Sequence, residues 1–361
     1  MVSLLKACSE LKDVQQGLHI HMKALQTGSL NTNPFVASSL IIMYAKCGFI
    51  ERSRLILDEL CSPNTVSWTA LITGYLENGL GLEALNCFNE MRFRGIFPDS
   101  ATFVCILKVC ADTIQVRKGQ EIHAEIERNG LLNRNAFLGC TLVDMYAKCG
   151  FLSRAEEVFF NLENPNVASW NSLIHGYVEH GNEKDAWSSF EMMQKNGISP
   201  DSFTFSCVLK ACSNAGALIK GQNLHKEIIG KSLEVDLSVG NTLISMYARG
   251  GLFLEAEYLF HTMGVRDVVT WTAMIGGFSD HGFTEEALKH YDEMHFEGIY
   301  PNSVTVICVL KACCANKNAI EKGRELHSEL IGIGLERENV ASNTLLAMYA
   351  KCGSWLDARY V

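Results

Sequence analysis

Met-Tyr-Ala-Lys-Cys-Gly at residues 43–48 decides the fold, because the same six residues return at 145–150 and 348–353 and a variant, Met-Tyr-Ala-Arg-Gly-Gly, stands at 246–251. The successive starts are 102, 101 and 102 residues apart. Leu-Lys-Ala-Cys or Leu-Lys-Val-Cys begins at 5, 107, 209 and 310, and Ser/Thr-Trp-Thr/Asn begins at 67, 169 and 270. Three signatures with one period and fixed offsets indicate a repeat architecture. Each long unit divides into three repeats, and each repeat has the length of one helical hairpin.

The segment 65–99 shows one such hairpin. Apolar residues from Trp68 to Tyr75 follow helical spacing, Asn78-Gly79 predicts a turn, and a second apolar helical pattern follows. One hairpin cannot bury the apolar faces of both its helices, so neighbouring hairpins must stack. The sequence therefore predicts an all-α fold, an α-solenoid of stacked helix-turn-helix repeats.

The composition limits the classes of function. A hydrophobic share of 48% over 361 residues predicts a fully folded chain, and a net charge of -9 argues against binding nucleic acid through charge alone. We find no charge-free apolar stretch of roughly 18 residues, so no membrane span is expected. The 14 cysteines form no Cys-x-x-Cys pair and are expected to be reduced, buried side chains in an intracellular compartment. The first residues resemble neither a secretory signal nor a transit peptide, so they indicate no location.

Repeats such as Val268–Asn302 resemble pentatricopeptide repeats, and the three alternating repeat types resemble the P, L and S motifs of plant organelle proteins. The resemblance covers essentially the whole chain and implies a right-handed superhelix of hairpins similar to those of tetratricopeptide proteins. It predicts one array that is cut inside a repeat at both ends: 1–33 partial L, 34–64 S, 65–99 P, 100–135 L, 136–166 S, 167–201 P, 202–236 L, 237–267 S, 268–302 P, 303–338 L and 339–361 partial S.

The resemblance also names base-reading residues. In that family the fifth and the last residue of a repeat contact one RNA base together, and short polar side chains suit a Watson–Crick edge. Five pairs are implied: Ser38 with Asn64 for adenine, Thr69 with Asp99 for guanine, Asn171 with Asp201 for uracil, Asn241 with Asp267 for uracil, and Thr272 with Asn302 for adenine. Asn343 also holds a fifth place, but its partner lies beyond Val361. Weak reading is expected at the remaining fifth places, which hold Val2, Val104, Cys140, Ser206 and Ile307.

Read from the amino to the carboxyl end, these pairs predict the RNA x-A-G-x-x-U-x-U-A, where x marks a weak preference. At the second place of the P repeats, Val66, Ala168 and Val269 are expected to clamp bases with apolar surface. At the thirteenth place of the S repeats, Lys46, Lys148, Arg249 and Lys351 are expected to follow the phosphates. The same place in the P repeats holds Glu77, Glu179 and Asp280, which weakens the expected backbone affinity.

Each assignment has an alternative. The polar pairs could instead be helix caps, since Ser, Thr, Asn and Asp favour that position. Trp68, Trp170 and Trp271 are expected to pack in the core rather than stack on bases. His-x-Glu at 123–125, 225–227 and 327–329 is half of a zinc deaminase signature, but the Pro-Cys-x-x-Cys half is absent from the sequence. We assign those triplets to the repeat, and predict no catalytic residue, metal or cofactor.

Three functions remain open at this point. The leading one is sequence-specific binding of single-stranded organellar RNA, in a mitochondrion or chloroplast. In this role the chain is the recognition part of a cytidine-to-uridine editing factor, with editing cofactors or a deaminase acting in trans and with no DNA or membrane partner. The second is a protein-interaction solenoid of the tetratricopeptide type. The third is a part of a longer enzyme whose deaminase-like domain follows residue 361.

Overall fold

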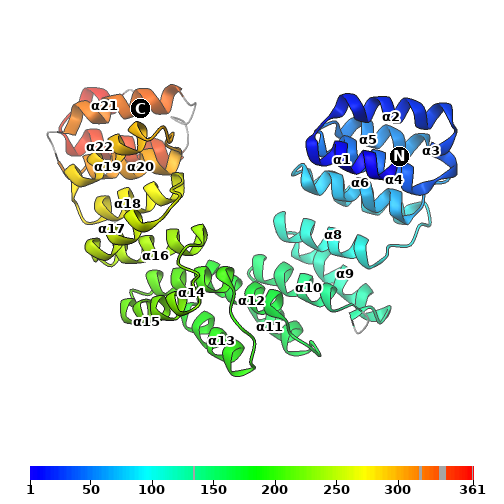
Figure 1. Cartoon of the computed structure of the whole chain (residues 1–361), viewed down its shortest axis with the longest axis horizontal. Helices are drawn as coiled ribbons and strands as arrows, with labels where there is room; N and C mark the ends of the chain where they lie inside the picture. Colours follow the sequence, from blue (N-terminus) through cyan, green and yellow to red (C-terminus); the bar gives the residue numbers. More distant parts are fainter. Residues whose placement is uncertain (133–134, 317–318, 333–338, 360) are drawn as a thin grey trace. The chain divides into compact units, whose positions relative to one another are not determined.

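The computed structural model describes residues 1–132, 135–316, 319–332, 339–359 and 361, and over these residues its regular elements are helices (Figure 1). The end predicted for the last L repeat, at 338, lies outside the described residues. The chain divides into two compact units, Met1–His180 and Gly181–Val361. Each unit is a row of helical hairpins, as the repeated signatures predicted.

In the first unit, one row of helices packs each on the next: α1 (Val2–Leu11), α4 (Pro34–Lys46), α6 (Thr65–Glu77), α8 (Ser100–Asp112), α10 (Ala136–Lys148) and α12 (Val167–Glu179). We call these the first helices. The second helix of each hairpin covers neighbouring first helices: α2 (Val14–Gln26), α5 (Ile50–Glu59), α7 (Gly81–Phe93), α9 (Val116–Arg128) and α11 (Leu152–Phe160). A short helix, α3 (Ser29–Thr32), leads into α4.

The second unit repeats this arrangement. Its first helices are α14 (Ser202–Asn214), α16 (Leu237–Arg249), α18 (Val268–Asp280), α20 (Ser303–Cys313) and α22 (Asn339–Lys351). Its second helices are α13 (Glu183–Lys195), α15 (Leu218–Gly230), α17 (Phe253–Thr262), α19 (Thr284–Phe296), α21 (Ile320–Gly332) and α23 (Trp355–Ala358). In Figure 1 the successive hairpins of this unit lie one above the other.

The core lies between the two helix layers of each unit. The three tryptophans predicted to be core residues, Trp68, Trp170 and Trp271, are at most 2% exposed. Trp271 meets the Phe260 ring edge to face at a centroid distance of 4.6 Å. Most cysteines are buried or half-buried, as expected, but Cys61 is exposed, because it follows the end of α5 in a turn.

Neighbouring first helices approach closely where glycine meets alanine. A methyl group added to Gly74, Gly176 or Gly277 would lie 2.6, 2.5 or 2.3 Å from the Cβ of Ala45, Ala147 or Ala248. These three glycines hold the same place in the predicted P repeats, and the alanines hold one place in the predicted S repeats that precede them. The close approach therefore fixes how each P helix sits on the S helix before it.

No helix among the described residues is both long and apolar enough to span a membrane.

Candidate nucleic-acid interface

The last residue of every segment predicted to be a complete S or P repeat caps the first helix of the next segment. Each cap side chain accepts a hydrogen bond at Oδ1 from the backbone N–H of the third helical residue, over 2.8–3.0 Å, and the residues are Asn64, Asp99, Asn166, Asp201, Asp267 and Asn302. At each of them the side chain of the third residue also completes a capping box. These residues therefore cap helices, as the alternative interpretation of the sequence predicted.

In the repeat predicted as the third S repeat, the fifth residue bonds directly to this cap. Asn241 donates from Nδ2 to Oδ1 of Asp267 over 3.1 Å, and its own Oδ1 accepts from the Thr270 hydroxyl over 2.6 Å. Asn241 is only 8% exposed, whereas Asp267 is half-buried. A base edge that approached this pair would therefore meet the cap residue first.

In two P repeats a hydroxyl relays the same link. Thr69 Oγ1 lies 2.7 Å from Thr102 Oγ1, which donates to Asp99 Oδ1 over 2.8 Å. Thr272 lies 2.7 Å from Thr305, which donates to Asn302 Oδ1 over 2.9 Å. Both predicted pairs are thus joined through the third residue of the following helix, a residue that was not among the predicted base-reading residues.

The other predicted residues are placed differently. Ser38 donates to the carbonyl of Pro34 in its own helix over 2.9 Å. Asn171 and Asp201 lie in different compact units. Cys140, expected to read weakly, directs its Sγ to Oδ1 of the cap residue Asn166 over 3.6 Å, and Asn343 is exposed on α22.

The electrostatics of the cap are clearest at Asp267. Partial burial alone would raise the pKa of its carboxyl group, but hydrogen bonds from Thr270, Asn241 and Val269 outweigh that effect and lower the pKa below its ordinary value. Asp267 is therefore an anion over the physiological pH range. It presents a charged acceptor to any group that approaches it.

In the carboxylate or amide group of each cap residue, one polar atom takes no part in the capping bonds. Because the capping bonds end on Oδ1, the remaining atom is Oδ2 in the aspartates and Nδ2 in the asparagines. Oδ2 can only accept a hydrogen bond, and Nδ2 can only donate one. Asp and Asn at the same cap thus offer opposite hydrogen-bonding characters while holding the helix in the same way.

Apolar side chains at the second place of the first helices are exposed beside these caps. The predicted clamps Val66 and Val269 are 45% and 51% exposed, and Ala168 is exposed as well. Apolar clamps were predicted in the P repeats alone, but the same place in the predicted S and L repeats also holds exposed apolar side chains. Phe35, Phe137, Phe203, Val304 and Val340 are 48–64% exposed. Their exposure could have been predicted, because each is the second residue of its helix, as the P-repeat clamps are.

The predicted phosphate-contacting residues end the first helices of the S repeats. Lys46, Lys148, Arg249 and Lys351 are all exposed, on α4, α10, α16 and α22. Lys148 lies 3.2 Å from Asp144 and 3.7 Å from Asp112, so two carboxylates offset part of its charge.

The His-x-Glu triplets are structural. Each histidine Nδ1 contacts a tyrosine hydroxyl of the next S repeat at 2.8–3.0 Å, in the pairs His123–Tyr146, His225–Tyr247 and His327–Tyr349, and His21–Tyr44 repeats the contact. Each glutamate instead turns back to the preceding P repeat, where Glu125, Glu227 and Glu329 contact Arg92, Gln194 and Tyr291. The two side chains of a triplet therefore point to different neighbours and form no catalytic pair.

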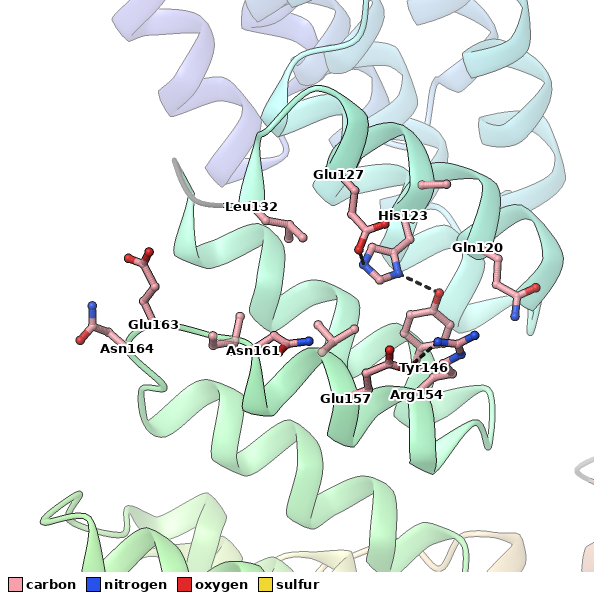
Figure 2. Close-up of a pocket in the computed structure, with 13 residues that line it drawn as sticks. Gln120, His123, Glu127, Leu132, Tyr146, Arg154, Glu157, Asn161, Glu163 and Asn164 are labelled. Atoms are coloured by element: carbon pink, nitrogen blue, oxygen red, sulfur yellow. Dashed lines mark hydrogen bonds and ion pairs between the residues drawn. The ribbon is translucent and has the colours of Figure 1, made fainter.

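Figure 2 shows one of these histidines at the wall of a cavity of about 850 Å³ between α9, α10 and α11. His123 faces Tyr146, and its Nε2 lies 3.4 Å from Oε1 of Glu127. Arg154 forms an ion pair with Glu157. Within the described ranges, no group of three or more His, Cys, Asp or Glu side chains is arranged to hold a metal ion.

Comparisons with known proteins agree with this geometry. A sequence model described as the PPR repeat family matches residues 63–112, 165–214 and 266–315, and one described as PPR repeat matches 140–164 and 241–268. Two relatives from Arabidopsis thaliana are named pentatricopeptide repeat-containing proteins. A mitochondrial one is 36% identical over 89% of this chain and 37% of its own length. A chloroplastic one is 34% identical over 98% of this chain and 56% of its own length, so the chain spans less than two thirds of either relative.

A solved structure shares the fold. The crystal structure of the maize pentatricopeptide repeat protein PPR10 in complex with an 18-nt psaJ RNA element matches with a TM-score of 0.70 at 21% identity, over 87% of this chain and 47% of that one. The prediction of an all-helical fold of stacked repeats is confirmed.

Proposed function

Because the chain belongs to the pentatricopeptide repeat (PPR) family, we propose that it binds single-stranded RNA sequence-specifically, with one base read per repeat. The single observation that carries the proposal is the cap geometry, in which one atom of each Asp or Asn stays outside the capping bonds on the face that carries exposed apolar side chains. Stacking surface beside a hydrogen-bonding edge is the combination that recognises single-stranded bases. PPR10, which shares the fold, was solved in complex with RNA.

The base assignments follow from this chemistry and from the family resemblance. Asp Oδ2 accepts from the ring N–H of guanine or uracil, and Asn Nδ2 donates to a ring acceptor of adenine. The proposed pairs are Ser38–Asn64, Thr69–Asp99, Asn171–Asp201, Asn241–Asp267 and Thr272–Asn302, which read A, G, U, U and A. The L repeats and the repeat of Cys140 read weakly, so the target is x-A-G-x-x-U-x-U-A.

The P, L and S segmentation and the biological role belong to the same proposal. The alternation of three repeat types favours a recognition part of a cytidine-to-uridine editing factor. Curated relatives are named as mitochondrial or chloroplastic, which supports an organellar location. Catalysis would come from a deaminase acting in trans or from a domain beyond this chain.

A mobility-shift assay tests the proposal. The purified chain is titrated into RNA carrying A-G-x-x-U-x-U-A and into a control RNA in which every specified base is exchanged. We expect tighter binding to the designed RNA, and a change from guanine to uracil at the second specified base in Thr69→Asn. Thr262→Asn, an exposed threonine at the end of α17, is the matched control and should leave the preference unchanged. Equal binding of both RNAs by the wild-type chain would exclude base reading.

A further inference from the structure

The signature Leu-Lys-Ala/Val-Cys, which recurs in each L repeat, contains a lysine that the base-reading proposal does not use. These lysines hold the ninth place of the L repeats, on the first helices α1, α8, α14 and α20: Lys6, Lys108, Lys210 and Lys311. All four are exposed. Their neighbours Leu107 and Val109, by contrast, are 0% exposed, so each lysine leaves an otherwise apolar stretch toward solvent.

Helical spacing places these lysines on the face that carries the caps and clamps. The ninth residue lies four positions after the fifth, which is one turn along the same side of a helix. The structure shows the consequence at Lys108, whose Nζ lies 5.9 Å from the centre of the Phe137 ring. Phe137 holds the second place of the next repeat and is 56% exposed. A cation beside an exposed aromatic ring is a pairing that binds the phosphate and the base of one nucleotide.

The charges around the L repeats complete the argument. Burial raises the pKa of the Cys105 and Cys308 thiols, and the positive charges of Lys108 and Lys311 oppose that shift. In the part of the chain that the structure describes, Lys6, Lys108 and Lys311 form no ion pair, so their charges remain available to a ligand.

The fifth places of the same repeats are poor base readers. Val2, Val104 and Ile307 carry no hydrogen-bonding group in their side chains, and Ser206 lies 3.1 Å from the hydroxyl of Ser238. An L repeat thus combines a weakly reading base position with an exposed cation one turn away.

We propose that the L repeats hold the RNA backbone, with Lys6, Lys108, Lys210 and Lys311 each contacting a phosphate, while the P and S repeats read the bases. This division of labour rests on the proposed RNA-binding function. It also explains how an acidic chain binds a polyanion. The first helices of the P repeats end in acidic residues, which interrupt the series of cations at the ends of the S-repeat helices. The lysines of the L repeats add cations between them.

The test compares two quadruple variants of the full chain by fluorescence anisotropy over a series of salt concentrations. Lys6→Gln, Lys108→Gln, Lys210→Gln and Lys311→Gln are combined in one variant. The matched control combines Lys23→Gln, Lys184→Gln, Lys195→Gln and Lys226→Gln, which are exposed on second helices and change the net charge equally. We expect the first variant to lower the slope of log K against log salt by about 0.7 per lysine, or about 3 in all. The control should keep the wild-type slope, and both should keep the preference for the designed RNA.

Three results separate the two proposals. Equal slopes for the two variants would overturn the phosphate role even if the wild-type chain prefers the designed RNA. Loss of base preference without a change in slope would also overturn it, because the lysines would then act on bases. If the wild-type chain bound no RNA, both proposals would fall. Recovery of the wild-type slope by Lys→Arg at the same four sites would support contact through charge, provided that the Lys→Gln variant keeps the lower slope and the wild-type thermal midpoint.

Discussion

Asp99 and Asn64 hold equivalent caps, and both use Oδ1 to accept from the third residue of the helix that follows. They differ in the atom outside those bonds, which is an acceptor in Asp99 and a donor in Asn64. At the residue scale, a change of specificity can therefore be separated from a change of stability. The fifth residue adds a second contact, and in Thr69 that contact runs through the Thr102 hydroxyl.

Asp99→Asn should change the preferred base at the Thr69 repeat from guanine to adenine and leave the thermal midpoint close to wild type, because Asn also caps well. Asp99→Ala should lose the preference and about 0.5–2 kcal/mol of stability. Competition binding with RNAs that differ at that base, together with thermal melting, measures both effects. The matched control is Asp13→Asn, which changes a cap on the second helix α2 and should alter no base preference. An equal change in both variants would contradict the assignment.

At the element scale, each L repeat is tied to the next S repeat by a histidine–tyrosine contact. Burial lowers the pKa of His21, His123 and His225 below the ordinary value for histidine. Well above pH 6.5 these rings are neutral in both the folded and the unfolded chain. As the pH falls below 6.5, the unfolded chain takes up protons first, so the folded chain loses stability.

The thermal midpoint should therefore fall between pH 7.5 and pH 5.5, and His21→Gln, His123→Gln and His225→Gln combined should make that fall shallower. Circular dichroism melting across this pH range gives the measurement. His261→Gln, at an exposed histidine on α17, serves as the control and should keep the wild-type pH dependence. A triple variant with the full wild-type dependence would show that other groups cause it.

The second feature at the element scale is the close packing of neighbouring first helices, where glycine meets alanine. Gly277→Ala would place a methyl group 2.3 Å from the Ala248 Cβ and 3.1 Å from its backbone. We expect a loss of about 1–3 kcal/mol in the free energy of unfolding, measured by urea titration. Gly230→Ala is the control, because its added methyl group meets nothing within 4 Å at the end of α15. That change should be neutral or stabilise by up to about 1 kcal/mol.

Elements and caps could be predicted from local sequence, whereas the contacts between repeats could not. Helical spacing around Trp68 and the turn at Asn78-Gly79 depend on residues close in the chain, and the structure has α6 and α7 on either side of that turn. The link between Thr69 and Thr102 joins residues 33 positions apart, so it depends on how the hairpins stack. The exposed lysine within Leu-Lys-Val-Cys was also missed, because an apolar signature does not show which of its members faces outward.

At the scale of the whole molecule, helices of each unit pack mainly on neighbours in the sequence. Such arrays have stabilities that add up repeat by repeat, so a local defect stays local. The two compact units, Met1–His180 and Gly181–Val361, allow a test of whether a defect in one unit leaves the other unit unchanged.

Hydrogen exchange followed by mass spectrometry should show faster exchange in α16, α18 and α20 of Gly277→Ala. Exchange in α4, α6 and α8 should match the wild-type chain, because they lie in the other unit. Comparable increases in both units would show that the array unfolds as one cooperative body.

The cap that completes one reading position belongs to the helix of the next hairpin. A genetic exchange whose breakpoint falls between Thr69 and Asp99 gives the recombinant protein a reading position with parts from two parents. A breakpoint just after Thr102 keeps the fifth residue, the relay hydroxyl and the cap together. Inheritance of a specificity as a whole therefore favours crossovers shortly inside a first helix, a few residues past the hairpin boundary.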